Sequence, residues 1–197
     1  MIKIIRKIYI IFIKIFFKKS YETYNTAAPI KPFGRILQYL RFNSTSFASW
    51  PIHKNSKVSG TKYIKIGIGT APGASFGNYI FANKESPINI GDYTIIAPNV
   101  GLAGFDHDIY DYRKYTSKGG IKIGSYCWIA MNSVIVDGVT LGDHTIVAAN
   151  SVVTKSFPEG YCIIGGNPAK LIKKIDKEKV VKYENKYKYR GFNRVKD

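Results

Sequence analysis

A period of six residues runs through the second half of the chain and constrains its fold more than any other feature. From residue 88 onward a large aliphatic residue stands at every sixth position, with one interruption. The positions are Ile90, Ile96, Leu102, Ile123, Ile129, Ile135, Leu141, Val147 and Val153. An α-helix repeats about every 3.6 residues and a strand about every two, so neither element alone explains this spacing. The period indicates a fold made of repeated structural units.

The residue after each aliphatic position is usually glycine or alanine. These small residues are Gly91, Ala97, Ala103, Gly124, Ala130, Gly142 and Ala148. A large inward side chain next to a small residue, where the backbone turns, suits a narrow triangular coil whose turns stack on one another. The pattern predicts a mainly β solenoid, and less regular residues upstream supply its earlier coils. These are Val58, Ile64, Ile80 and Phe81.

With 197 residues, the chain is expected to form one domain in three parts. Residues 57–172 should form the solenoid, with a loop insertion at 104–120. Residues 1–56 should form a helical and then irregular segment, with a short helix near 34–42. Residues 173–197 should form a short, basic helical tail.

Charge is concentrated at the two ends of the chain. Cationic side chains outnumber acidic ones by six to none in residues 1–19, by thirteen to nine in residues 20–169 and by eleven to four in residues 170–197. Basic ends are typical of contact with a polyanion or an anionic membrane surface, and nucleic acid is not the partner we expect. Cys127 and Cys162 have neither disulfide-framework nor metal-ligand spacing, which favours a reducing cytoplasm and no bound metal.

Residues 1–19 have the pattern of a basic amphipathic helix. At about 100° per residue, five cations fall in a sector about 120° wide. They are Lys3, Arg6, Lys7, Lys14 and Lys18, and the far side carries Ile4, Ile5, Ile8, Phe12, Ile15 and Phe16. The longest uncharged run, Ile8 to Ile13, is too short for a signal peptide or a membrane span. The alternatives are peripheral binding to the inner membrane face or packing on this domain or another subunit.

The stretch IGSYCWIAMNSVIVDGVTLGDHTIVAANSVVTKSFPEGYCIIGGNPAKLIKKI resembles the hexapeptide-repeat acyltransferases, in particular the maltose, galactoside and exopolysaccharide O-acetyltransferases. The likeness covers about residues 58–175. It implies a left-handed parallel β-helix, which is an exception to the usual right-handed crossover. It also implies a homotrimer with active sites between neighbouring subunits and acetyl-CoA as the acyl donor.

The inserted loop contains the candidate catalytic residue, His107. Acyl transfer to a hydroxyl needs a base that removes the proton, and an imidazole does this near neutral pH. In the resembled family an equivalent loop carries the catalytic histidine, and His107 matches its position. Asp106 and Asp108 flank it and are candidates to orient the ring or to stabilise the imidazolium. His53 and His144 are expected to be structural or exposed.

The resemblance also implies which residues hold coenzyme A. Thr154 and Lys155 would lie near the pantetheine and phosphates, Trp128 beside the thiol arm, and Lys170 and Lys173 opposite phosphates. Ala130 and Ala149 would allow close approach of the backbone. Cationic side chains suit the phosphate charges of this donor. Packing and solvation are the competing roles for these residues.

The function expected from the sequence is transfer of acetyl from acetyl-CoA to a sugar hydroxyl in surface polysaccharide synthesis. Asn78 and Glu85 are candidates for acceptor contacts. One rival is an N-acyltransferase acting on an amino sugar. The other is a non-catalytic solenoid that presents its basic ends to a partner.

Overall fold

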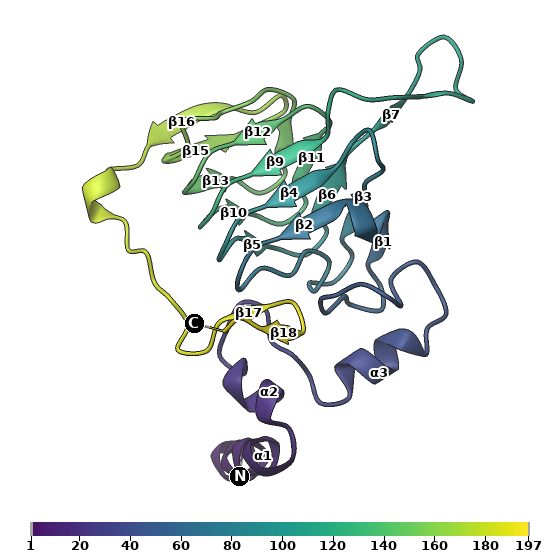
Figure 1. The fold of residues 1–197 in the computed structure, drawn as a ribbon. Helices are drawn as coiled ribbons and strands as arrows, with labels where there is room; N and C mark the ends of the chain where they lie inside the picture. The colour runs from purple at the N-terminus through teal and green to yellow at the C-terminus, as the bar shows by residue number, and fades with distance from the viewer. Residues whose placement is uncertain (1, 197) are drawn as a thin grey trace.

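The computed structural model describes residues 2–196, and from β1 to β15 the chain winds as a stack of coils (Figure 1). From β3 to β14, outside the inserted loop, successive strands enter the three sheets in a repeating order, and each of these strands pairs in parallel with strands one coil away. The fold is therefore mainly β, as the six-residue period predicts.

The coils contribute short strands to three sheets. The first sheet contains β1 (Lys57–Ser59), β3 (Tyr79–Phe81), β6 (Gly101–Ala103), β11 (Val134–Val136) and β14 (Val152–Val153). The second contains β2 (Ile64–Ile66), β4 (Ile88–Ile90), β9 (Ile121–Ile123) and β12 (Thr140–Leu141). The third contains β5 (Ile95–Ile96), β10 (Trp128–Ile129), β13 (Thr145–Val147), β15 (Cys162–Gly165) and the antiparallel β16 (Lys170–Lys174). A 3-10 helix, η1 (Thr61–Tyr63), lies between β1 and β2.

The core is a set of aliphatic columns inside the coil. In the first sheet the paired inward residues are Val58, Ile80, Leu102, Ile135 and Val153, and all are fully buried. Every aliphatic position of the six-residue period is buried, which confirms that part of the prediction. Burial of these apolar side chains against the next coil is the main stabilising contribution.

Two of the small residues are required by the close approach of the next coil. A Cβ atom on Gly91 would lie 2.5 Å from the backbone nitrogen of Ser125, and one on Gly124 would lie 2.6 Å from that of Asp143. Both distances are shorter than van der Waals contact. Glycine at these positions is therefore a consequence of coil stacking.

A ladder of aromatic rings follows the corner between the second and third sheets. Tyr93, Tyr126, His144 and Tyr161 occupy equivalent turns with φ values of 53°, 57°, 52° and 47°. Left-handed backbone is unfavourable for such residues, and stacking of the rings offsets part of this cost. The centroids of Tyr126 and His144 are 5.0 Å apart, and the ring planes differ by 4°. His144 is a buried structural residue, as expected.

Three helices lie beyond the first coil: α1 (Ile2–Phe16), α2 (Lys18–Glu22) and α3 (Gly34–Tyr39) (Figure 1). The apolar side of α1 is largely uncovered, with Ile8 61% and Ile15 67% exposed. Ile13, in the last turn of α1, is by contrast fully buried. Within residues 2–196, no helix has the length and hydropathy needed to cross a bilayer.

The C-terminal tail differs from the predicted basic helix. After β16 it forms a single 3-10 turn, η2 (Lys177–Lys179), and then the hairpin of β17 (Tyr189–Arg190) and β18 (Asn193–Arg194). Figure 1 shows this yellow segment returning along the coil to α2. The hairpin is held by long-range bonds, including Phe192 N–H to the Ser49 carbonyl oxygen at 2.9 Å. These tertiary contacts, absent from any local pattern, replace the helix.

Candidate active site

The inserted loop leaves the coil between the first and second sheets, after β6, and returns at β9. Within it, β7 (Asp106–His107) pairs antiparallel with β8 (Tyr115–Thr116). The buried carboxylate of Asp137, in the next coil, accepts hydrogen bonds from the backbone N–H groups of Lys118 and Gly120. The base of an otherwise exposed loop is thus fixed to the neighbouring coil.

His107 is exposed on this loop, and its ring orientation is set by backbone and aromatic contacts. Its Nδ1 lies 2.6 Å from the carbonyl oxygen of Tyr112. A carbonyl oxygen only accepts, so Nδ1 carries the proton in the neutral ring and Nε2 has a free lone pair. The Tyr115 ring packs 4.6 Å from the imidazole, centroid to centroid, with Phe105 edge-on behind it. The geometry suits a base that accepts a proton at Nε2.

Within residues 2–196, neither flanking aspartate side chain forms a hydrogen bond with the His107 imidazole. Oδ1 of Asp108 instead accepts from the backbone N–H groups of Tyr110 and Asp111, each at 2.9 Å. Asp106 is exposed, and its backbone carbonyl accepts from the Thr116 hydroxyl. In this structure the Tyr112 carbonyl is the partner of Nδ1, and a role for Asp106 or Asp108 beside His107 stays a prediction.

The residues predicted to bind acetyl-CoA lie in two places on the coil. Trp128 projects from the third sheet, 49% exposed, in register with Ile95, which is also exposed on that outer face. Ala130 and Ala149 lie at the turns that follow this sheet, Ala130 buried and Ala149 exposed.

The lysines predicted to bind acetyl-CoA are all exposed. Lys170 and Lys173 lie on β16, at the edge of the third sheet. Thr154 and Lys155 follow β14 and lie at the corner between the first and second sheets, where the inserted loop also leaves the coil. No ion pair within residues 2–196 involves Lys155, Lys170 or Lys173. These ammonium groups are therefore available to an anionic ligand.

The two acceptor candidates have different environments. Asn78 is fully buried, and its side-chain amide donates to the Ala97 carbonyl oxygen at 2.8 Å. It supports the coil and does not reach an acceptor, which corrects the expectation for this residue. Glu85 is exposed, and its backbone carbonyl accepts from Ser117 on the returning limb of the loop at 2.8 Å.

Sequence reasoning missed three groups that shape this site. The Tyr112 carbonyl and the Tyr115 ring hold His107, and Asp137 anchors the loop. A backbone carbonyl has no signature in a sequence. The Asp-Gly pair at 137–138 is a turn signal that identifies a corner, although not its partner.

Other reactive groups do not form a second catalytic centre. The Cys127 thiol donates to the Gly142 carbonyl oxygen at 3.2 Å, and burial raises its pKa to about 12. Burial also raises the pKa of Cys162. Within residues 2–196, no group of three or more His, Cys, Asp or Glu side chains is arranged to hold a metal ion.

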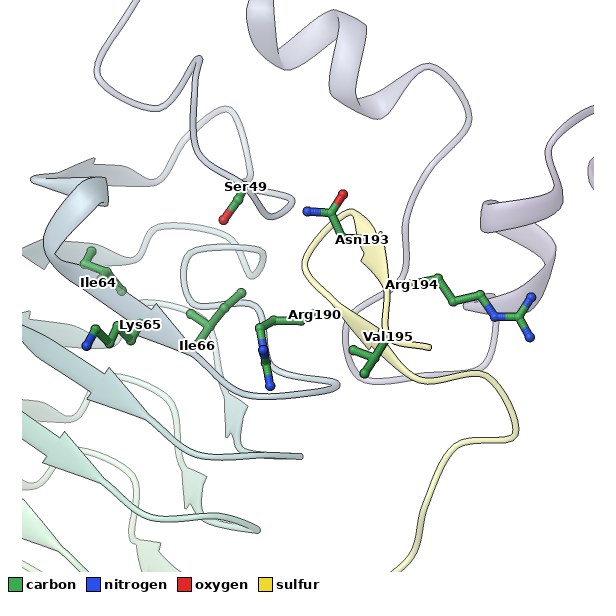
Figure 2. A pocket seen from close by; sticks show the side chains of 8 residues that line it. All are labelled: Ser49, Ile64, Lys65, Ile66, Arg190, Asn193, Arg194 and Val195. Carbon is green, nitrogen blue, oxygen red and sulfur yellow. The ribbon is translucent and has the colours of Figure 1, made fainter. Parts of the chain in front are cut away.

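A cavity of about 610 Å³ lies between β2 and the β17–β18 hairpin (Figure 2). Figure 2 shows Arg194 directed away from this cavity, and its guanidinium is 3.5 Å from the Glu22 carboxylate. None of the predicted site residues lines the cavity. It is therefore separate from the candidate active site.

Comparison with known proteins identifies similar sequences for part of the chain. Residues 120–155 match the family model described as bacterial transferase hexapeptide (six repeats). The chain is 36% identical over 104 residues to the galactoside O-acetyltransferase of Escherichia coli (strain K12), covering 51% of each chain. The chain thus spans about half the length of the curated relatives it matches.

Solved structures show similarity over a larger part of the chain. A maltose O-acetyltransferase from Clostridium difficile 630 superposes with a TM-score of 0.53 at 30% identity, covering 64% of this chain and 66% of that one. A galactoside acetyltransferase in complex with coenzyme A gives a TM-score of 0.53 at 28% identity, covering 73% of this chain and 70% of that one. The likeness in structure therefore extends well beyond residues 120–155.

Proposed function

Because the chain belongs to the hexapeptide-repeat acyltransferase family, we propose that it transfers the acetyl group of acetyl-CoA to a sugar hydroxyl. The observation that carries the proposal is the pairing of His107 Nδ1 with the Tyr112 carbonyl. It leaves Nε2 of an exposed ring as a proton acceptor. Hydroxyl acylation requires such a group at the acceptor oxygen.

The proposed reaction is direct and has no covalent enzyme intermediate. His107 takes the hydroxyl proton at Nε2 while the acceptor oxygen forms a bond to the thioester carbonyl carbon. The carbon–sulfur bond then breaks, and the departing thiolate takes up the proton that His107 holds. A backbone N–H of the coil stabilises the oxyanion between these steps.

The donor would lie along the outer surface of the coil. Trp128 and the small residues Ala130 and Ala149 form its proposed path near the thiol arm. Thr154, Lys155, Lys170 and Lys173 are proposed to contact the remainder of the donor. The support is the exposure of Trp128 and of the lysines, together with the coenzyme A complex of the similar galactoside acetyltransferase.

We propose a left-handed β-helix assembled as a homotrimer, with each site shared by two subunits. In one chain the His107 loop leaves at the corner of the first and second sheets, whereas Trp128 lies on the third sheet. A neighbouring copy would bring the two together. Co-expression of His107→Ala and Trp128→Ala chains should restore activity in mixed trimers. Activity that stays at the level of the separate variants would contradict shared sites.

Glu85 is the remaining proposed acceptor contact, because it lies beside the returning limb of the loop. The acceptor is proposed to be a glycan of surface polysaccharide synthesis, acetylated in the cytoplasm. The basic and apolar sides of α1 support peripheral contact with the inner membrane face, where lipid-linked glycans are assembled.

The test is release of coenzyme A from acetyl-CoA in the presence of a panel of glycans and amino sugars. Release that depends on a glycan hydroxyl supports the proposal. Release that depends only on amino sugars would favour an N-acyltransferase. No release above background with any acceptor would favour the non-catalytic solenoid.

A further inference from the structure

A cavity of about 530 Å³ lies between the N-terminal segment and the first coils. Lysine, arginine and histidine side chains line it, and its lining contains no Asp or Glu. We call it the basic cavity. Its titratable lining residues are Lys31, Arg41, His53 and Lys54. No ion pair within residues 2–196 involves Lys31, Arg41 or Lys54. The positive charge gathered here therefore lacks a carboxylate that would balance it.

The clustered positive charges and partial burial lower pKa values in the basic cavity. Burial lowers the pKa of His53, and the charges of Lys31, Arg41 and Lys54 lower it further. Burial also lowers the pKa of Arg41. Like charges that are partly desolvated repel one another, and an anion placed among them would remove the penalty.

The walls of the basic cavity are held in place. A guanidinium N–H of Arg41 donates to the Ile52 carbonyl oxygen at 2.7 Å. The buried Gln38 donates to the carbonyl oxygens of Thr45 and Trp50 and accepts from the Ile52 N–H. These bonds fix the segment that carries Arg41 and His53 before any ligand binds, which lowers the entropic cost of binding.

The polar groups that His53, Arg41 and the lysines offer are hydrogen-bond donors. His53 Nδ1 accepts from the Asn55 N–H at 3.1 Å, so Nε2 carries the proton in the neutral ring. Ammonium and guanidinium groups have no acceptor. A ligand that suits this set has several acceptor oxygens and negative charge, and phosphate is the biological group with that chemistry.

An apolar groove of about 400 Å³ adjoins the basic cavity, and the two share Lys31, Gly34 and Phe192 in their linings. Its apolar lining residues are Phe17, Ile30, Phe33, Ile36 and Phe192. Lys18, Lys19 and Arg35 also line it, so the groove is apolar within a cationic surround. The groove begins directly after α1, the helix with the uncovered apolar side.

We propose that the basic cavity binds the phosphate of a phosphorylated lipid whose hydrocarbon chain occupies the apolar groove. Lys31 lines both spaces and would lie where the headgroup joins the chain. This site does not depend on the proposed acetyl transfer, because its occupancy can be measured without acetyl-CoA. Neither the hexapeptide period nor the His107 loop contributes a residue to it.

Calorimetric titration of the full-length protein with three probes tests the site. The probes are inorganic phosphate, dihexanoyl phosphatidic acid and dihexanoyl phosphatidylcholine, the lipids being used below their micelle concentrations. We expect phosphatidic acid to bind at least about tenfold more tightly than inorganic phosphate, because only the lipid fills both spaces. Equal affinity for these two probes would overturn the lipid assignment, and phosphatidylcholine binding as tight as that of phosphatidic acid, or tighter, would overturn the assignment of the basic cavity to a net anionic phosphate.

Variants separate the two parts of the site. Lys31→Gln with Lys54→Gln should weaken phosphatidic acid binding by about tenfold or more, since charge-assisted hydrogen bonds are lost. Phe33→Ser with Ile36→Ser should weaken phosphatidic acid binding while leaving that of inorganic phosphate unchanged. The matched control is Lys122→Gln with Lys179→Gln, two exposed lysines that line neither space. Affinity that falls equally in the control would reduce the effect to net charge and overturn the proposal.

Arg41→Gln is an additional variant, read together with its thermal unfolding because Arg41 also bonds to Ile52. Within residues 2–196, the side chains of Lys31 and Lys54 form no comparable hydrogen bond. The Lys31→Gln, Lys54→Gln variant therefore still tests the site if Arg41→Gln is unstable. Wild-type affinity in the folded lysine-pair variant would overturn the assignment.

Discussion

His107 Nδ1 lies 2.6 Å from the carbonyl oxygen of Tyr112, five residues further along the same loop. This contact orients the imidazole without a carboxylate and leaves Nε2 available. It makes the role of His107 testable separately from that of its acidic neighbours.

Replacing His107 by alanine should lower turnover by about two to four orders of magnitude, because a positioned general base is removed. Assembly and coenzyme A binding should be retained, since the side chain is exposed and outside the core. Single-turnover kinetics with acetyl-CoA and the preferred acceptor measure the effect. Tyr110→Ala, at a 91% exposed position of the same loop, is the control. Near-normal turnover in His107→Ala would show that another group is the base.

Substitutions of Asp108 should separate loop shape from charge. Asp108→Asn keeps an oxygen that can accept from Tyr110 and Asp111, so we expect activity within about threefold of wild type. Asp108→Ala removes both bonds and should reduce activity by about tenfold or more through loss of loop geometry. The comparison of kcat for the two variants decides the matter. A large loss in Asp108→Asn would mean that the negative charge acts on His107.

Lys155→Ala and Lys170→Ala should mainly raise the KM for acetyl-CoA and leave kcat nearly unchanged. The proposed contacts are to parts of the donor that do not react, so they contribute equally in the ground and transition states. Initial rates over a range of acetyl-CoA concentrations measure both constants. Lys122→Ala, on the outer face of the second sheet, is the control. An unchanged KM in both variants would place the donor elsewhere.

The two cysteines should resist alkylation in the native protein. The thiolate is the reactive form, and burial raises the pKa of Cys127 to about 12 and also raises that of Cys162. At pH 8 we therefore expect slow labelling by iodoacetamide in the native protein and rapid labelling after unfolding in guanidinium. Mass spectrometry over time quantifies each site. Fast native labelling of Cys127 would contradict its buried position.

Deletion of residues 1–12 should strongly reduce sedimentation with anionic liposomes. It removes most of the exposed apolar side of α1 and three of its cations, and it retains the buried Ile13. Binding of the full-length protein should weaken as the salt concentration is raised, because salt screens the attraction between anionic lipids and the cations on one side of α1. Full-length protein that stays in the supernatant at low salt would refute membrane contact. If the proposed trimer forms and the deletion dissociates it, α1 would instead be assigned to subunit packing.

Much of the coil could be predicted from local sequence. The inward column of Leu102, Ile135 and Val153 and the small corner residue Gly124 recur because each coil meets its neighbour in the same way. The bounds of the inserted loop follow directly, since an interruption of a period is visible wherever it occurs. His107 is the one histidine in this loop, and its role as the base, which the family resemblance implies, stays a prediction.

Other parts of the molecule were decided only by tertiary structure. The tail gave no sign that Phe192 would bond to Ser49, and nothing marked Asn78 as a buried support of the coil. No periodic pattern predicts that the Tyr112 carbonyl bonds to His107. Likewise, none predicts that Lys31 and Lys54 line the same cavity. The physical reason is that repeated contacts at fixed spacing leave a period in the sequence, whereas a single contact between distant segments depends on the path of the whole chain.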